Sequence, residues 1–399
     1  MKTTVLFVDD DLNILSGLKR MLRVMREQMD FHFAESGREA LEMLAGQRIN
    51  VIVSDMRMPG MDGAALLTAV QERYPHVIRI MLTGHADEEA IFRTVGVVHQ
   101  FLAKPADPDA LKAVLLRACA LQKLMKNEQL KRLVTRLGKL PSLPAVYAEL
   151  QRKIVDPNCA IGDVAAIIEK DIGMSAKVLQ LVNSAFFGLY KSIDSPLRAV
   201  NLLGLDTIKT LVLGVRVFEE LKTSSSDVFL VGELWEHSLM TATFAKKIAV
   251  AESGDKQFID TVFIAGMMHD VGKLLLFSTM RDAYVQAVYM AREHRISLYQ
   301  AEHHVLHSDH SDVGSYLMGL WGLPGEVVEA LAFHHRLDDY PAPSLSAAVV
   351  VHVADVICLH LYPEMGIGTP PVLNQGYLEQ AGLANRFQRW LRKCQGKEA

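Results

Sequence analysis

The chain has 399 residues, of which 50% are hydrophobic and 22% charged, a balance that excludes a disordered protein. Lysine and arginine number 42 against 46 aspartates and glutamates, so the formal net charge is −4 and no nucleic-acid-coating surface is expected. The length predicts two or three domains, each able to bury a core. The four cysteines form no CxxC pair, which argues against a disulfide framework or a zinc site built from cysteines.

The first 105 residues alternate short apolar runs with amphipathic stretches. The apolar runs are Val5–Val8, Phe31–Ala34, Val51–Val53, Ile78–Leu82 and Phe101–Ala103. Helical patterns such as Leu12–Met25 and Arg38–Leu44 fall between them. This alternation predicts an α/β, flavodoxin-like, doubly wound parallel sheet of five strands with helices on both faces.

One long helical pattern follows, from Asp107 to about Leu137. We interpret it as the last helix of the α/β domain plus a linker helix, with a dimerising coiled coil as the alternative. The segment Leu140–Pro144 marks a boundary. Beyond it the pattern predicts a succession of helices, including single helices over Asp206–Glu220 and Asp260–Ser278, and hence an all-α domain.

Polar residues follow the ends of four apolar runs, namely Asp9, Asp10, Asp55, Thr83 and Lys104. In a doubly wound sheet such groups meet in one crevice at the carboxyl ends of the strands. Three carboxylates need a cation to stay ionised together, and oxygen ligands suit Mg²⁺. A divalent ion lets a phosphoryl donor approach a carboxylate, while the lysine and the threonine bind phosphoryl oxygens.

This set resembles the receiver domain of two-component response regulators over residues 2–122. The stretches that carry the likeness are Phe7-Val-Asp-Asp-Asp11, Ser54-Asp-Met-Arg-Met-Pro-Gly-Met-Asp-Gly63, Leu82-Thr-Gly84 and Lys104-Pro105. The resemblance implies that Asp55 is the phosphoacceptor for a sensor histidine kinase and binds Mg²⁺ with Asp9 and Asp10. It also implies a switch pair, Thr83 and Phe101, and a phosphate-sensing amine, Lys104. An unphosphorylated pseudo-receiver is the alternative.

A second set of histidines and carboxylates lies on or beside predicted helices. It comprises His237, His269, Asp270, His310, His334, His335 and Asp355. Polar groups on apolar helix faces need partners. If these groups converge in one helical core, they would hold a transition metal such as Fe, Mn, Zn or Ni, which activates water for attack on a phosphoester. The alternative is a buried hydrogen-bonded network without metal.

The order of this set resembles the HD superfamily of metal-dependent phosphohydrolases, in which Lys273 would be the companion catalytic residue. Further stretches narrow the likeness to the HDOD domain, the HD-related output domain, over roughly residues 135–390. These are Leu140-Pro-Ser-Leu-Pro144, Leu181-Val-Asn-Ser-Ala-Phe-Phe-Gly188, Arg198-Ala-Val-Asn-Leu-Leu-Gly204 and Trp321-Gly-Leu-Pro324. The resemblance implies an all-helical regulatory or interaction module without established catalysis.

The predicted organisation is a receiver domain at 1–122, its terminal helix and a linker at 107–138, and the HDOD domain at 139–395. Two functions stay open. In the first, phosphorylation switches an HDOD module that binds a partner protein or a cyclic dinucleotide. In the second, the receiver gates a metal-dependent phosphodiesterase for a cyclic-di-GMP-like substrate. The stretch Arg336–Pro341 is shorter than the corresponding loop of the HD-GYP phosphodiesterases and lacks its glycines, which argues against that substrate.

Partners and location are predicted from what the sequence lacks. No helix-turn-helix recognition element is visible, so direct DNA binding is not expected. The first four residues lead directly into an apolar run without a secretory pattern. The apolar stretch Leu345–Leu361 is interrupted by His352, Asp355 and His360, which predicts a buried helix and no membrane span. We expect a cytoplasmic protein, with a homodimer through the linker helix as a possibility.

Overall fold

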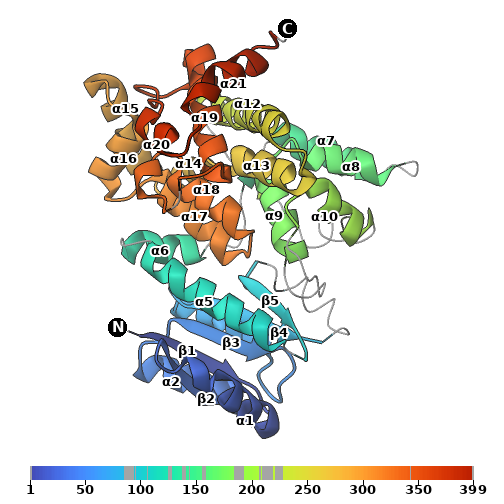
Figure 1. Ribbon diagram of the computed structural model, residues 1–399. Helices are drawn as coiled ribbons and strands as arrows, with labels where there is room; N and C mark the ends of the chain where they lie inside the picture. The colour runs from blue at the N-terminus through green and yellow to red at the C-terminus, as the bar shows by residue number, and fades with distance from the viewer. Residues whose placement is uncertain are drawn as a thin grey trace.

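The computed structural model has an N-terminal α/β part and a C-terminal helical part, with two helices between them (Figure 1). This confirms the predicted fold class. The structure describes residues 2–84, 94, 96–105, 107–124, 128–136, 141–142, 144–154, 159–183, 193–205, 208, 219–220, 228–341 and 343–397.

The N-terminal sheet has the strand order β2-β1-β3-β4-β5, and every neighbouring pair is parallel. Its strands are β1 (Thr3–Val8), β2 (Met29–Ala34), β3 (Val51–Asp55), β4 (Ile78–Thr83) and β5 (Gln100–Ala103). The strands β3 and β4 are buried along their whole length, because helices cover both faces of the sheet. The strand order reverses direction between β1 and β3, where doubly wound folds bind ligands.

The helices of this part begin at side-chain caps. Asp11 accepts a hydrogen bond from the Asn13 amide at the start of α1, at 2.7 Å, and Asp62 accepts one from the Ala65 amide at the start of α3, also at 2.7 Å. Such caps satisfy amides that have no partner within the helix. The helical elements are α1 (Leu12–Met21), the 3₁₀ turn η1 (Leu22–Met25), α2 (Gly37–Gly46), α3 (Gly63–Arg73) and α5 (Pro108–Leu124).

The C-terminal part is built from helices packed around one apolar core. They are α7 (Pro144–Ile154), α8 (Ile161–Ile168), α9 (Ile172–Asn183), α10 (Pro196–Leu203), α12 (Val228–Glu252), α13 (Lys256–Met268), α14 (Val271–Thr279), α15 (Arg281–His294), α16 (Leu298–Leu306), α17 (His310–Leu320), α18 (Gly325–Phe333), α19 (Ala347–Leu361), α20 (Gln375–Gln380) and α21 (Phe387–Cys394). Short 3₁₀ turns are η4 (Leu337–Asp339), η5 (Pro363–Met365) and η6 (Ala384–Arg386).

Two predicted helices in this part need correction. The helix predicted over Asp260–Ser278 is two helices, α13 and α14, which meet at His269 and Asp270. The apolar pattern continues across the break because both helices are buried, so periodicity alone did not reveal it. The helix predicted over Asp206–Glu220 lies mostly outside the described residues. Its last two residues form β7 (Glu219–Glu220), which pairs in parallel with β6 (Pro141–Ser142).

The predicted long helix over 107–137 contains α5 and a second described helix, α6 (Glu128–Arg136), while residues 125–127 lie outside the described chain. Both helices pack against α17 of the same chain. Leu121, Leu130 and Val134 are almost fully buried. The apolar seam of the linker therefore covers the output part of its own chain.

Polar contacts also join the two parts. The Arg79 guanidinium is fully buried and donates to the Thr135 carbonyl at 2.8 Å, beside His99, whose Nε2 lies 2.8 Å from the same carbonyl. The Thr135 hydroxyl in turn lies 3.0 Å from the Tyr316 hydroxyl on α17. The sheet, the linker helix α6 and the helical part thus share one hydrogen-bonded junction.

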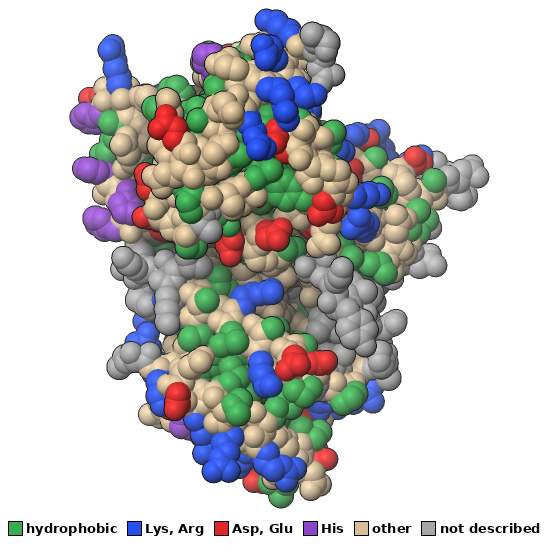
Figure 2. Space-filling model, in the orientation of Figure 1, with side chains coloured by type: hydrophobic (Ala, Val, Ile, Leu, Met, Phe, Trp, Pro, Cys, Tyr) green, Lys and Arg blue, Asp and Glu red, His purple; other side chains and the backbone are tan. Residues whose placement is uncertain are grey.

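Within the described part of the chain, the helical stretch Lys256–Thr279 is long and apolar enough to cross a membrane, with a mean hydropathy of 1.3 over an 18-residue window. However, 83% of that window is buried inside the protein, as expected for the core helices α13 and α14. The apolar helix α19 is likewise buried from Ala347 to Leu359. On the face in Figure 2, lysine and arginine side chains gather near α1 and over α21, at opposite ends of the molecule.

Candidate phosphorylation site and metal centre

The predicted phosphorylation residues lie together at the carboxyl edge of the sheet. The ammonium group of Lys104 is 2.8 Å from Asp9 Oδ2 and 2.8 Å from Asp55 Oδ1. Asp9, Asp10 and Asp55 each offer an oxygen within 4.8 Å of the others. The Thr83 hydroxyl is buried and has no hydrogen-bond partner among the described residues. The crevice therefore combines a cluster of carboxylates, one amine and one free hydroxyl.

Lys104 offsets part of the negative charge of the carboxylates in this crevice. Burial raises the pKa of Asp55, and Lys104 opposes that rise. Burial lowers the pKa of Lys104, but hydrogen bonds to Asp55 and Asp9 more than offset it, so the pKa is raised. The amine thus remains charged between two carboxylates, where an anionic group on Asp55 would replace one of its partners.

Gly63 explains why the loop after Asp55 can lie close to it. A Cβ atom at Gly63 would lie 2.0 Å from the Asp55 carbonyl oxygen, and the Gly63 amide donates to the Met56 carbonyl at 2.9 Å. Only glycine permits this approach. The Met56 amide also donates to Asp55 Oδ1 at 2.7 Å, which fixes the carboxylate.

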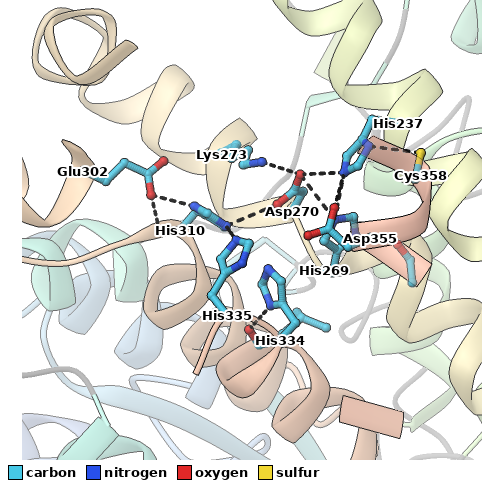
Figure 3. A network of polar contacts seen from close by, with 12 residues as sticks. His237, His269, Asp270, Lys273, Glu302, His310, His334, His335, Asp355 and Cys358 are labelled. Carbon is cyan, nitrogen blue, oxygen red and sulfur yellow. Dashed lines mark hydrogen bonds and ion pairs between the residues drawn. The ribbon is translucent and has the colours of Figure 1, made fainter. Parts of the chain in front are cut away.

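In the helical part, the seven predicted histidines and carboxylates meet in one buried cluster (Figure 3). Two groups each bring their ligand-type atoms within 4.8 Å of one another. The first is Asp270, His310, His334 and His335, and the second is His237, His269 and Asp355. The break between α13 and α14 places His269 and Asp270 at this centre, because a continuous helix would turn their side chains apart.

The imidazole nitrogens face one another as ligands of a common ion would. His237 Nε2 lies 3.2 Å from His269 Nε2, and His310 Nε2 lies 3.0 Å from His335 Nε2. Two ligands at about 2.1 Å from one ion lie roughly 3.0–3.4 Å apart, depending on the angle between them. In addition, His334 Nε2 is buried without a hydrogen-bond partner among the described residues. The donor set therefore fits divalent cations.

Asp270 lies between the two groups. Its Oδ1 is 3.3 Å from His310 Nε2, while its Oδ2 is 3.5 Å from His237 Nε2 and 3.4 Å from His269 Nε2. Asp270 would hold a divalent cation together with the first group, and it also lies close to the second. Lys273 Nζ donates to Asp270 Oδ2 at 2.5 Å, so this lysine supplies positive charge beside the carboxylate.

In four of the five cluster histidines, Nδ1 has a partner of its own (Figure 3). His269 Nδ1 donates to the Gly266 carbonyl at 2.7 Å and His334 Nδ1 to the Leu331 carbonyl at 2.8 Å. His310 Nδ1 lies 2.6 Å from Glu302 Oε2 and His237 Nδ1 lies 3.5 Å from Cys358 Sγ. Such outer contacts fix the ring and leave Nε2 for a metal ion.

The pKa is lowered for some histidines of the cluster and raised for others. Burial, together with neighbouring imidazoles, holds the pKa of His334 and His335 well below the usual value, so both are neutral. Burial alone would also lower the pKa of His237, but its hydrogen bond to Asp355 raises it to about 10. Burial likewise opposes the ionised form of Asp355, but His237 lowers its pKa to about 2. Cation binding would release the His237 proton.

A cavity of about 390 Å³ opens onto this cluster. Its wall includes four cluster residues, His237, Asp270, His335 and Asp355. The remainder is mixed, with the cationic side chains Lys273 and Arg295 and the aromatic side chains Tyr284 and Tyr299. A cavity of this size lies at the small end of the range for bound small molecules.

Sequence reasoning missed three residues that support the cluster. They are Glu302, His352 and Cys358. His352 Nδ1 donates to the His334 carbonyl at 2.7 Å. Each had a signal in the helical spacing: Glu302 lies on the apolar stripe of its helix, while His352 and Cys358 lie three residues before and after Asp355.

Family models match both parts of the chain. The response regulator receiver domain matches residues 5–116 and the HDOD domain matches residues 140–337. The chain therefore belongs to the response regulators that carry an N-terminal receiver domain and a C-terminal HDOD domain.

Individual relatives match parts of the chain. The DNA-binding transcriptional regulator NtrC of Escherichia coli (strain K12) is 35% identical over 150 residues, which is 36% of this chain and 32% of that protein. The signal receiver domain of an HD domain-containing protein from Pseudomonas fluorescens Pf-5 is 30% identical, covering 31% of this chain and 100% of that structure, with a TM-score of 0.30. The MmoQ response regulator from Methylococcus capsulatus str. Bath is 20% identical, covering 63% of this chain and 98% of that structure, with a TM-score of 0.49.

The chain spans only part of the curated relatives it matches. The matched share of three of them is 39%, 25% and 32% of their length.

Proposed function

We propose that this response regulator is controlled by phosphorylation of Asp55, with a sensor histidine kinase as the source of the phosphoryl group. The observation that carries the proposal is the position of Lys104 Nζ, 2.8 Å from both Asp9 and Asp55, beside the unpartnered Thr83 hydroxyl. Asp9, Asp10 and Asp55 would hold Mg²⁺, which supplies positive charge to the transferred group.

The residues of the chain perform the transfer as follows. An Asp55 carboxylate oxygen attacks phosphorus, a phosphorus–oxygen bond to Asp55 forms, and the bond to the leaving group breaks. Lys104 then pairs with a phosphoryl oxygen instead of the free carboxylate. Thr83 has a hydroxyl to donate to a second oxygen, and movement of Thr83 leaves space into which the buried Phe101 shifts.

The test is labelling by acetyl phosphate with Mg²⁺. Wild type should incorporate phosphate, and Asp55→Asn should not. Asp62→Asn is a matched control, because Asp62 caps α3 close to the crevice but does not belong to it. Equal labelling of wild type and Asp55→Asn would place the acceptor elsewhere.

The output we propose is recognition by the HDOD domain of a partner protein or of a nucleotide second messenger such as a cyclic dinucleotide. The cavity beside the cluster supports the second of these, since it combines cationic with aromatic side chains. We also propose a cytoplasmic location, where a sensor kinase would reach the receiver.

A second candidate function is a receiver-gated, metal-dependent phosphodiesterase. It is favoured by the facing Nε2 atoms and by the position of Asp270 between the two groups. Bound divalent ions would act as Lewis acids on a phosphoester. Lys273 lines the cavity and would bind a phosphoryl oxygen, while the fixed imidazoles keep the donor atoms in place.

This function is tested by metal analysis and by turnover. Protein purified without chelator should hold at least one transition metal per chain, and His269→Ala should lose it. His304→Ala is the control, because His304 is an exposed histidine of α16 outside the cluster. Cyclic-di-GMP hydrolysis that His269→Ala abolishes would establish the enzyme. Metal well below one ion per chain would exclude it.

A further inference from the structure

Helix α17 joins the receiver domain to the metal cluster. Its first residue is His310, inside the cluster, and its last is Leu320, at the receiver. Eleven residues at 1.5 Å each give a rod of about 16 Å. Except for the partly exposed Asp312, every residue of the helix is buried. A rod packed on all sides moves as a unit, because close-packed interiors transmit displacement.

The receiver binds the carboxyl end of this helix directly. The Gln100 side-chain amide donates to the Leu320 carbonyl at 2.9 Å and to the Gly319 carbonyl at 3.4 Å. The last carbonyls of a helix lack partners within it. The Gly319 carbonyl also accepts from the Gly322 amide at 3.1 Å, so Gln100 chiefly satisfies the Leu320 carbonyl. A Cβ atom at Gly319 would lie 2.5 Å from a Leu121 methyl carbon, so α5 and α17 are in close contact here.

Gln100 lies on the same strand as two residues of the proposed phosphorylation site. Gln100 is the first residue of β5. The next residue is Phe101, the proposed switch aromatic, and Lys104 comes three residues after Phe101. The strand β5 is the edge of the sheet and pairs with β4, in which Thr83 is the last residue. A displacement of Phe101 or of β5 is therefore transmitted to Gln100 through one peptide bond.

The other end of α17 is held within the cluster. The His310 amide donates to Glu302 at 2.9 Å, and His310 Nε2 faces His335 Nε2 at 3.0 Å. A Cβ atom at Gly272 would lie 1.9 Å from the His310 carbonyl oxygen, so α14 and α17 are in direct backbone contact. A shift of the rod changes the position of one cluster imidazole relative to Asp270.

We propose that α17 is the link through which the state of Asp55 sets the affinity of the cluster for divalent cations, with Gln100 as its receiver-side contact. This inference rests on the proposed phosphorylation and metal-binding functions. It states that two sites on different domains are coupled through one helix, and coupling of this kind is reciprocal in binding free energy.

The experiment measures Mn²⁺ binding to the full chain by calorimetry, with and without beryllofluoride as a phosphoryl mimic, at one fixed Mg²⁺ concentration that saturates the carboxylate site of the receiver. In wild type, beryllofluoride should change the Mn²⁺ dissociation constant at least 5-fold. In Gln100→Ala the change should fall below 2-fold, while acetyl phosphate still labels Asp55. A second variant, Gln100→Met, keeps the side-chain length and removes the donor.

The matched control is Gln71→Ala. Gln71 makes the same type of contact, donating from its side-chain amide to the Gly96 carbonyl at 3.2 Å, but inside the receiver. This variant should keep the wild-type coupling. Reciprocity supplies a second readout, because Mn²⁺ should change the affinity for beryllofluoride by the same factor in wild type.

The outcomes distinguish failure of the proposed link from failure of the proposed phosphorylation or metal-binding function. Mn²⁺ binding that beryllofluoride does not alter, with Asp55 labelled normally, overturns the link and leaves both proposed functions standing. Coupling that persists in both Gln100 variants also overturns the link. A chain that binds no Mn²⁺ overturns the metal centre and the link together.

Discussion

At the scale of single residues, the cluster depends on side chains that never face its centre. Glu302 is fully buried, and one carboxylate oxygen accepts from the His310 ring and also from its amide. A carboxylate behind a histidine fixes the ring orientation and increases its basicity. In the proposed metal centre, Glu302 would therefore act through His310, as a positioning residue.

We predict that Glu302→Ala weakens Mn²⁺ binding by roughly 10–100-fold, because His310 loses its fixed orientation. Isothermal calorimetry measures the effect. The control is His304→Ala on the same helix, whose side chain is exposed, and which should bind Mn²⁺ as wild type does. Unchanged affinity in Glu302→Ala would show that His310 needs no such support.

The His237–Asp355 pair predicts a pH profile for the metal-free protein. The pKa of His237 is raised from 6.5 to about 10, so its stabilisation is complete below pH 6.5 and is lost as pH rises toward 10. The pKa of Asp355 is lowered from 3.8 to about 2, so its stabilisation is complete above pH 3.8 and is lost as pH falls toward 2. The His237–Asp355 pair therefore stabilises the folded protein most between pH 3.8 and pH 6.5.

We therefore expect urea unfolding in chelator to give a free energy of unfolding that falls by a few kcal/mol between pH 6.5 and 9. Asp355→Asn should show a smaller fall, because its His237 has lost its main partner. The same slope in wild type and Asp355→Asn would contradict the assignment of this dependence to the pair.

At the scale of elements, the site requires α14 and α17 to touch. Gly272, in the first turn of α14, lies against the His310 carbonyl. A Cβ atom at Gly314 of α17 would lie 3.1 Å from the Gly272 amide nitrogen. Two glycines at a helix crossing allow backbones to approach more closely than any larger residue permits. This crossing brings Asp270 and His310 to the same point.

We predict that Gly272→Ala lowers the free energy of unfolding by about 3 kcal/mol, because the new methyl group cannot avoid the backbone of α17. Thermal or urea unfolding measures the loss. Gly162→Ala on α8 is the matched control, since no atom lies within 4 Å of its Cβ position, and it should stabilise by about 0.5–1 kcal/mol. Equal stability of the two variants would mean that α14 and α17 separate at no cost.

At the scale of the whole molecule, the linker joins rather than separates the domains. The carbonyl of Thr135 on α6 accepts hydrogen bonds from the receiver side chains Arg79 and His99. The Thr135 hydroxyl contacts the Tyr316 hydroxyl on α17. Buried polar groups joined in this way restrict the relative movement of the parts that carry them. The receiver, the linker helix α6 and α17 are therefore joined by buried hydrogen bonds.

We predict a coupling energy of about 1 kcal/mol between Thr135→Val and Tyr316→Phe in a double-mutant cycle on unfolding. A control cycle pairs Tyr316→Phe with Thr68→Val. Thr68 lies at an exposed position of α3, and its hydroxyl donates locally to the Ala64 carbonyl. That pair should be additive within about 0.5 kcal/mol. Additivity of Thr135→Val with Tyr316→Phe would mean that the hydroxyl contact does not join the domains.

The fold class, and the residues that form the crevice and the cluster, were predictable from the amino-acid pattern. Apolar periodicity reveals which face of an element is buried, and the carboxyl ends of parallel strands share one edge. Asp9, Asp55 and Lys104 could therefore be assigned to one pocket without coordinates. The histidines and carboxylates of the output domain were found because polar groups on apolar helices demand partners.

The arrangement of those groups and the side chains that support them follow from the packing of the helices and could not be predicted from the pattern. The break at His269 and Asp270 follows from how α13 and α14 pack, and the seam of the linker helices faces α17 because that helix lies beside them. Contacts such as His237 with Cys358, 121 positions apart, or Gln100 with Leu320, 220 apart, leave no local pattern. Periodicity records the neighbours of a residue along its own helix or strand, whereas contacts between elements arise from three-dimensional packing.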